Sequence, residues 1–415
     1  MTQTAWDRTT FVDITQFAEV EEILRRGREF VVGGTKAGSM EFVHGTLVAT
    51  DGREHLARRR ALMKMISAEQ PWGAEGTLVD EIFEQYLQHV VETHEPRNGN
   101  VHFDLVSLGR RVVWRVTAAF VGLDGIDDPA QVERFQDLVK PVLEGLTLEY
   151  QPEARHQEIL SSARYSRARI REEMFDPSLQ RRRSLIEAAR RSGNEDDLPA
   201  DLITSMLVHG GDNPDIDVIF RELIALLAAS VNNPVSQMAW ALDDLTSWLG
   251  THPEYRTEST TKGFLNRAVK ETMRLHRSSR PHLVRIAAKD TVLETTGREI
   301  PEGTWLSLWV QTANRETAIF GDDADRYDPL RMPSDPKIHP FGVGLGAGPH
   351  VCLGRPLLLW DQGGEEAQGL LIKLLRFLLT HGVRPDPAGQ QVEGGPVGGR
   401  RHSRYDVIMP APADA

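Results

Sequence analysis

Apolar residues recur at helical spacing along much of the chain. The segments 79–91, 101–121 and 131–148 carry apolar side chains at a period near 3.6 residues, which predicts amphipathic helices. The segment 216–249 is the most apolar long helix candidate, and residues 223–229 are all apolar. We therefore expect this helix to be buried on all sides.

Shorter segments carry the signals of strands. Residues 11–14 alternate between apolar and polar positions, and a helical period follows over 18–30. Residues 291–316 predict strands around a turn at Pro301-Glu-Gly303-Thr. The sequence therefore predicts a mainly α fold with a smaller β region, and we expect residues 1–415 to form a single domain.

Composition narrows the class of protein. The 48 basic and 60 acidic residues give a net charge of −12, which argues against nucleic acid and against a membrane surface as a partner. One cysteine excludes an internal disulfide. The chain has no leader-like N-terminus and no uncharged apolar run of about 18 residues, so we expect a cytoplasmic protein without a membrane span.

The one cysteine lies in a glycine-rich stretch, Leu345-Gly-Ala-Gly-Pro-His-Val-Cys-Leu-Gly354. The glycines let the backbone fold tightly and approach a flat ligand closely. A leucine-rich run over 353–375 predicts a helix directly after Cys352, and a helix N-terminus stabilises a thiolate. A lone thiolate in an apolar, glycine-rich pocket suits a haem iron. An inert buried cysteine beside a turn is the alternative interpretation.

The pattern Gly346-x-Gly348-x-His350-x-Cys352-x-Gly354 resembles the haem-binding loop of the cytochrome P450 family, the haem-thiolate monooxygenases. The resemblance covers about residue 10 to the end. It implies the family's triangular prism, a haem b cofactor, Cys352 as the proximal iron ligand, and a cofactor-binding role for the loop, including Gly346, His350 and Gly354.

Two further motifs carry basic residues. His55 and Arg59 are four residues apart and share one helix face, where two cationic donors suit a carboxylate pair. In the family, the His-x-x-x-Arg of this helix binds haem propionates, and Arg285 matches the propionate contact of an Arg-x-Ala motif. A solvated basic face is the alternative for the helix.

A third motif predicts structural support rather than catalysis. Glu271 and Arg274 lie three residues apart on one helix face, where an arginine–carboxylate pair tolerates burial. The family joins such a pair to an arginine further along the chain. Arg326, in Asp325-Arg326-Tyr327, matches that position, so the resemblance implies a buried triad of Glu271, Arg274 and Arg326.

The central helix departs from the family pattern. Asn232 and Asn233 stand where the resemblance implies a catalytic acid–alcohol pair for proton delivery, and Pro234 should kink the helix. An amide orients a water but is a poor proton source at neutral pH. Three interpretations follow: water or substrate relays protons, the enzyme uses peroxide, or it runs an isomerising or ring-forming reaction.

Other departures affect the edges of the site. The family usually has about fifty more residues before position 10, so the shortened N-terminus puts the outer pocket wall in doubt. Leu345 replaces the usual phenylalanine, while Leu359 and Gly363-Gly364 alter the face that normally docks an electron donor. By resemblance the substrate pocket includes Phe42, Ala229, His282, Leu283 and Val397. Arg400, Arg401 and His402, at a loop tip, would clamp an anionic substrate group or face solvent.

Together these motifs predict an oxidoreductase of secondary metabolism that oxidises a small organic substrate. By resemblance, electrons come from NAD(P)H through a ferredoxin reductase and a ferredoxin. A peroxide-using or isomerising enzyme is the first alternative. A haem-binding sensor or carrier of small ligands, without turnover, is the alternative from another class.

Overall fold

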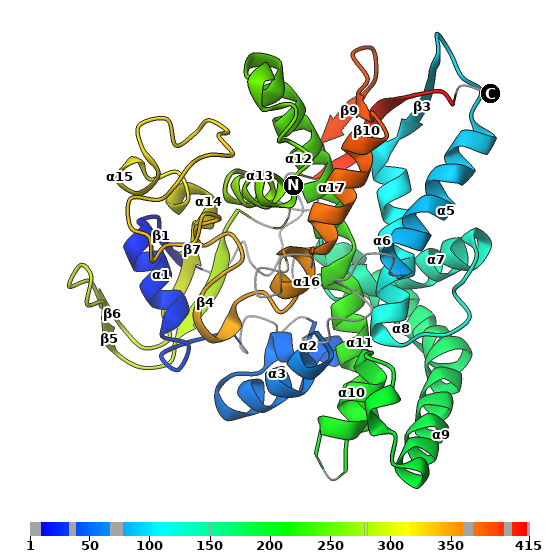
Figure 1. Ribbon diagram of the computed structural model, residues 1–415. Helices are drawn as coiled ribbons and strands as arrows, with labels where there is room; N and C mark the ends of the chain where they lie inside the picture. Colours follow the sequence, from blue (N-terminus) through cyan, green and yellow to red (C-terminus); the bar gives the residue numbers. More distant parts are fainter. Residues whose placement is uncertain are drawn as a thin grey trace.

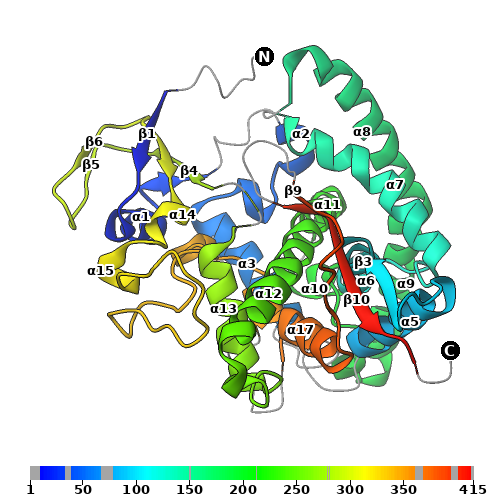
Figure 2. The ribbon, with the colours of Figure 1, turned by 90° about the horizontal axis from the view of Figure 1, so that it is seen from above.

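The computed structural model describes residues 10–32, 39–66, 78–148, 151–211, 213–277, 279, 281–359, 368–393 and 401–412. Figures 1 and 2 show a large helical part beside a smaller part that carries most of the short strands. Val397, Arg400 and Gly363-Gly364 lie outside the described residues.

The helices of the first half are α1 (Phe17–Arg25), α2 (Met40–Val43), α3 (Gly52–Ile66), α5 (Leu78–Thr93), α6 (Leu105–Val121), α7 (Pro129–Gly145), α8 (His156–Ile170), α9 (Asp176–Ser192) and α10 (Leu202–His209). Those of the second half are α11 (Ile216–Ser230), α12 (Asn232–Thr251), α13 (Lys262–Leu275), α14 (Val310–Ala313), α15 (Thr317–Phe320), α16 (Arg355–Leu359) and α17 (Leu370–Thr380).

The first sheet has the strand order β1-β7-β4-β2, with β1 parallel to β7 and the other pairs antiparallel. Its strands are β1 (Phe11–Ile14), β2 (Phe30–Val31), β4 (Leu283–Ala287) and β7 (Trp305–Leu308). The second has the order β3-β10-β8, with β9 also paired to β10. It comprises β3 (Asn100–Asp104), β8 (Arg384–Pro385), β9 (Gln391–Glu393) and β10 (His402–Pro410). A separate hairpin pairs β5 (Thr291–Val292) with β6 (Glu299–Ile300).

Local signals explain where α6 and α7 begin and end. Asp104 caps α6 through the amide of Val106, and Gly122 closes it in the left-handed conformation with a φ of 84°. Asp128 and Gln131 form a capping box at the start of α7. The apolar period predicted over 101–121 therefore contains two elements, because its first residues pair with β10 as strand β3.

The helix predicted over 353–375 is wrong for the described residues. The described part of α16 reaches Leu359, the backbone at Gln368 and Gly369 is not helical, and α17 begins at Leu370. The physical reason is a close approach of the two segments. A Cβ at Gly369 would lie 2.2 Å from the carbonyl oxygen of Leu358.

The long apolar helix forms as two pieces, α11 and α12, separated at Val231. Pro234 has no amide to donate to the carbonyl of Ser230 one turn earlier, so the helix breaks close to the predicted kink. The pair is long and apolar enough to cross a membrane, yet 61% of its most apolar window is buried inside the protein. It is therefore a core element of the fold.

Two hydrophobic clusters form the core. The larger joins the helical part and the smaller joins α1 to the first sheet. The cysteine loop touches both, since Leu353 belongs to the larger cluster and Ala347 packs against the smaller. The loop therefore lies where the two parts of the molecule meet.

Candidate active site

The loop around Cys352 folds back on itself. The amide of Cys352 donates to the carbonyl oxygen of Leu345, 2.8 Å away, and Gly346 and Gly348 have φ angles of 77° and 65°. A Cβ at Gly348 would lie 2.5 Å from the carbonyl oxygen of Leu24 in α1. These glycines therefore permit both the turn and the close contact with α1.

The surroundings of the Cys352 sulfur raise the pKa of its thiol overall, through opposing contributions of which burial is the largest. Burial raises the pKa of the thiol, whereas the backbone amides of Gly354 and Arg355 and the charges of Arg59 and Arg277 lower it. A cation bound to the sulfur would lower the pKa of the thiol further, as the two amides and the two arginines do. Amides and cations around one half-buried sulfur are the surroundings that suit a metal-bound thiolate.

Cys352 lines a cavity of about 400 Å³ whose walls are mostly apolar. Residues of α3, α6, α11, α12 and β4 also line it. Of the described pocket candidates, Ala229 and Leu283 line it. Phe42 does not: its ring instead packs in the core against Gly145 and beneath Arg167. His282 does not line the cavity either; its ring lies beside that of Trp309 in a tilted arrangement, with 5.1 Å between ring centroids.

His55 and Arg59 connect α3 to the cysteine loop. The His55 ring nitrogens lie 3.1 Å from the Leu47 carbonyl oxygen and 3.0 Å from that of Pro349. Arg59 donates through Nη1 to the carbonyl oxygen of Val351, at 2.8 Å. Both side chains line the cavity, and burial lowers the pKa of each. The pair is therefore not a solvated basic face.

His350 completes this contact between helix and loop. Its ring centroid lies 3.9 Å from that of His55, and its Nε2 lies 3.1 Å from Oδ1 of Asp51. Asp51 also accepts from the backbone amide of Val32. The start of α3 therefore holds His350 at the cavity wall.

Arg285, on β4, also lines the cavity, where burial lowers its pKa to about 10. The structure adds Arg277, which sequence reasoning missed. Arg277 donates to the carbonyl oxygen of Gly344 at 2.8 Å, and burial likewise lowers its pKa to about 10. Its one signal in the sequence is its position just after α13, close to the Glu271–Arg274 motif. Three arginines thus border one apolar cavity, which suits a ligand with negative groups.

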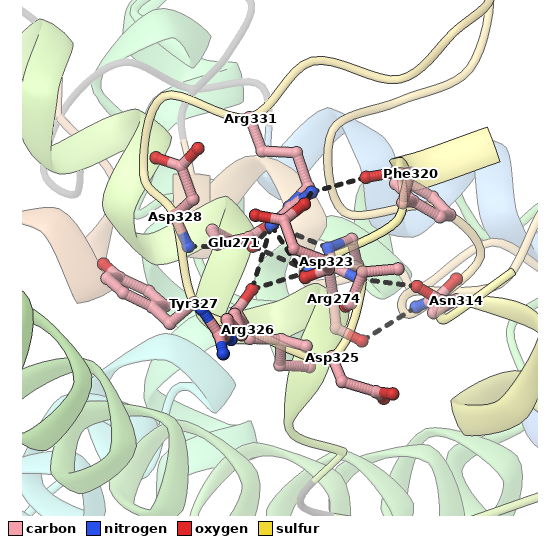
Figure 3. A network of polar contacts seen from close by, with 12 residues as sticks. Glu271, Arg274, Asn314, Phe320, Asp323, Asp325, Arg326, Tyr327, Asp328 and Arg331 are labelled. Atoms are coloured by element: carbon pink, nitrogen blue, oxygen red, sulfur yellow. Dashed lines mark hydrogen bonds and ion pairs between the residues drawn. The ribbon is translucent and has the colours of Figure 1, made fainter. Parts of the chain in front are cut away.

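The buried support beside the loop differs from the predicted triad. Glu271 and Arg274 form a bidentate ion pair with both N–O distances at 2.7 Å. Arg331 supplies the third side chain, with Nε 3.1 Å from Glu271 (Figure 3). The Arg326 side chain is exposed, and Arg326 contributes only its carbonyl oxygen, to Arg274 and Arg331. The assignment of Arg326 is therefore corrected to Arg331.

A network around this pair reaches the cysteine loop. Arg274 donates to the carbonyl oxygen of Asn314 (Figure 3), and the side-chain oxygen of Asn314 accepts from the amide of Val343. Asn314 also donates to the carbonyl oxygen of Phe341. The network therefore fixes the start of the loop and has no direct contact with the cavity among the contacts described.

Asn233 lines the cavity from α12, next to the helix break. Its Nδ2 donates to the carbonyl oxygen of Ala229 at 3.1 Å, and its Oδ1 lies 3.5 Å from Arg401. Asn232, at the first position of α12, accepts from the Ser236 hydroxyl through its carbonyl oxygen. The side-chain amide of Asn233 therefore links α12 to the end of α11 across the helix break, and it forms part of the cavity wall.

Glu222 of α11 is a second residue that sequence reasoning missed. It is fully buried and lines the cavity. Burial raises its pKa to about 7, against the backbone amide of Leu47 and the charge of Arg58. A single glutamate within the apolar segment 216–229 was the available signal.

These residues fit a haem. The half-buried thiol, with amides and cations around it, matches an iron ligand. The apolar walls match a flat apolar ring, and the three bordering arginines match its acidic substituents. Within the described residues, no group of three or more His, Cys, Asp or Glu side chains is arranged to hold a metal ion. The described chemistry therefore favours a cofactor held through one thiolate.

Comparison with known proteins agrees with this geometry. A family profile described as Cytochrome P450 matches residues 263–359. Erythromycin C-12 hydroxylase of Saccharopolyspora erythraea is 26% identical over 59% of this chain and 49% of its own. Mycinamicin IV hydroxylase/epoxidase of Micromonospora griseorubida is 26% identical over 83% of this chain and 77% of its own. Several matches, including that to the hydroxylase, span only 36% to 49% of the relative's length.

Solved structures share the whole architecture. The crystal structure of CalO2 aligns with a TM-score of 0.69 at 17% identity, covering 99% of this chain and 93% of that one. The P450 CYP109B1 from Bacillus subtilis aligns with a TM-score of 0.68 at 19% identity, covering 98% and 95%. The predicted fold class, mainly α with a smaller β region, is confirmed.

Proposed function

Because this chain belongs to the cytochrome P450 family, we propose that it is a haem-thiolate monooxygenase acting on a small organic substrate. The observation that carries the proposal is the Cys352 sulfur, half-buried at a cavity wall among two amides and two arginines. O₂ and electrons from NAD(P)H, delivered by a ferredoxin reductase and a ferredoxin, complete the proposed reaction.

In this proposal Cys352 is the proximal iron ligand, and Gly346 and Gly354 leave room for the cofactor beside it. Arg59, Arg277 and Arg285 neutralise the propionates, with His55 and His350 at the same wall. The haem, when bound, supplies the oxidative chemistry. The protein positions the reactants, and its apolar walls exclude water from the cavity. Its charged side chains lie at the edges of the cavity.

The part of the cavity wall that carries Asn233 and Glu222 favours a second candidate function within the same family. The Asn233 amide contacts Ala229 and Arg401, and Glu222 is the one acid among the described residues that line the cavity. Asn233 follows Glu222 by eleven positions and lies beyond the break between α11 and α12. A wall with one acidic side chain suits an oxidant that needs little proton delivery, such as peroxide. It also suits a ring-forming or isomerising reaction.

The site of action is proposed to be the cytoplasm, and residues 1–415 are proposed to act as a single domain. The apolar α11–α12 pair is largely buried, and the net charge of −12 disfavours anionic surfaces. The cysteine loop contacts both hydrophobic clusters, which supports one functional unit.

A carbon monoxide difference spectrum tests the proposal. We expect the red-shifted thiolate band in protein reduced with dithionite, and equally with NAD(P)H, a reductase and a surrogate ferredoxin. A Cys352→His variant should bind haem without that band. Reduction by dithionite alone would favour the peroxide or isomerising candidate, and tight ligand binding without product would favour a sensor. Haem-loaded, folded protein without the thiolate band would contradict the assignment.

A further inference from the structure

Glu222 presents an unusual polar group to an apolar cavity. It lies in the second turn of α11 with no exposed surface. Its Oε2 accepts from the backbone amide of Leu47 at 2.8 Å. Its Oε1 is buried and has no hydrogen-bond partner among the described residues. A buried carboxylate oxygen without a partner is costly, so this atom needs an explanation.

The nearest cation does not provide one. Nε of Arg58 is 3.9 Å from Oε2, beyond hydrogen-bonding distance. Oε2 is also the oxygen that already accepts from the Leu47 amide, so Arg58 leaves Oε1 without a partner in the described part of the chain. This partial compensation leaves the pKa of Glu222 raised to about 7, because burial outweighs both favourable contacts. A donor at Oε1 would stabilise the ionised carboxylate further.

Among the described residues, three arginines and one acidic side chain line the cavity. Arg59, Arg277 and Arg285 border it near the cysteine loop, and Glu222 is the one acidic side chain among its described lining residues. Leu226 and Ala229 follow Glu222 along the same cavity-facing side of α11. A ligand in this cavity therefore meets apolar walls, one thiol and one carboxylate.

We propose that Glu222 binds a protonated amine of the substrate through Oε1, so that the enzyme selects apolar molecules carrying one basic nitrogen. The term substrate rests on the proposed monooxygenase function, whereas binding of the amine does not. The apolar wall accommodates the hydrocarbon part of the molecule. An ammonium N–H supplies both the donor and the charge that the buried carboxylate lacks.

The experiment measures binding to the haem-loaded full chain by equilibrium dialysis. Three probes share one phenylbutyl body: N,N-dimethyl-4-phenylbutylamine is cationic, 5-methylhexylbenzene is neutral, and 5-phenylpentanoic acid is anionic. The Soret band is recorded in parallel to exclude binding of the amine through direct ligation of iron. The Glu222→Gln variant keeps the shape of the side chain and removes its charge.

We expect Glu222→Gln to weaken amine binding roughly 10- to 100-fold, the effect of losing a charged hydrogen bond, and to leave the neutral probe within about twofold. Asp217→Asn is the matched control. It removes one negative charge from the same helix at an exposed side chain paired with Arg171, and should change neither affinity. Glu222→Asp should retain part of the preference for the cation.

Equal loss of affinity for the amine and the neutral probe in Glu222→Gln would overturn the proposal. So would wild-type protein that binds the anion as tightly as the amine, a result that requires no variant to fold. The carbon monoxide spectrum separates the two hypotheses. Selective amine binding without the thiolate band would refute the monooxygenase assignment alone, and the band without selectivity would refute the role of Glu222 alone.

Discussion

At the scale of single residues, burial decides which side chains matter. Arg326 and Arg331 lie five positions apart in the same irregular segment, and the sequence motif pointed to Arg326. Only Arg331 turns inward to Glu271, while Arg326 offers its carbonyl oxygen and exposes its side chain. Neither helical periodicity nor strand alternation applies to this segment, so the sequence pattern had no means of distinguishing them.

Replacing each arginine by alanine tests this assignment. Arg331→Ala leaves a buried carboxylate with one partner fewer and should lower the free energy of unfolding by about 3 kcal/mol or more. Arg326→Ala removes an exposed side chain and keeps the carbonyl contact, so its effect should stay within about 0.5 kcal/mol. Urea denaturation of both haem-loaded variants measures the difference. Equal losses in the two variants would contradict the assignment to Arg331.

Glu222 predicts a pH dependence of stability. Burial raises its folded pKa from 4.5 to about 7, so the folded state holds a proton that the unfolded state releases between these values. The contribution of Glu222 to stability therefore falls as pH rises through this window, by about 3 kcal/mol in total.

The comparison of wild type with Glu222→Gln isolates this effect, because glutamine does not titrate. Relative to wild type, the variant should gain about 3 kcal/mol of unfolding free energy between pH 4.5 and pH 8. Denaturant titrations of both proteins, without added substrate, at several pH values provide the measurement. A difference that does not vary with pH would show that Glu222 keeps an ordinary pKa.

At the scale of elements, close approach between segments sets the boundaries. The leucine-rich run after Cys352 has a helical composition, yet α16 and α17 are separate because the backbone at Gly369 presses on α16. The break between α11 and α12 follows instead from a local cause, Pro234. Local causes are visible in sequence, whereas contacts between distant backbones are not.

Two glycine-to-alanine changes contrast these cases. At Gly369 a Cβ would meet backbone atoms of Leu358 and Leu359 at 2.2 to 2.4 Å, so Gly369→Ala should destabilise the protein by about 3 kcal/mol or more. Gly250 lies in α12 with no atom within 4 Å of the same position. Gly250→Ala should stabilise the helix by up to about 1 kcal/mol. Thermal unfolding should move the midpoints in opposite directions, and an unchanged midpoint for Gly369→Ala would show that the segments separate easily.

At the scale of the whole molecule, the cavity joins parts that fold from distant stretches of sequence. Its arginines come from α3, from the segment after α13 and from β4, and its thiol comes from the loop between the two hydrophobic clusters. Like charges near a shared cavity repel one another unless a ligand neutralises them. The fold is therefore expected to depend on its cofactor.

Removing haem should lower the thermal midpoint by about 5 °C or more, because haem binds the folded chain and compensates the arginines. The midpoint of the haem-free protein should recover on reconstitution with haem. Adding sulfate to the haem-free protein should recover part of the loss by screening the arginines. Identical midpoints with and without haem would show that the cavity is stable without a ligand.

The sequence by itself determined the helical character of the chain, the cysteine loop, the Glu271–Arg274 pair and the kink near Pro234. Each of these depends on residues close together in the chain, where spacing fixes geometry. Tertiary structure alone decided that Arg331 rather than Arg326 completes the buried network, that Phe42 packs away from the cavity, and that Arg277 and Glu222 line it. These outcomes depend on which distant segments meet, and burial then sets the charge and hydrogen bonding of each side chain.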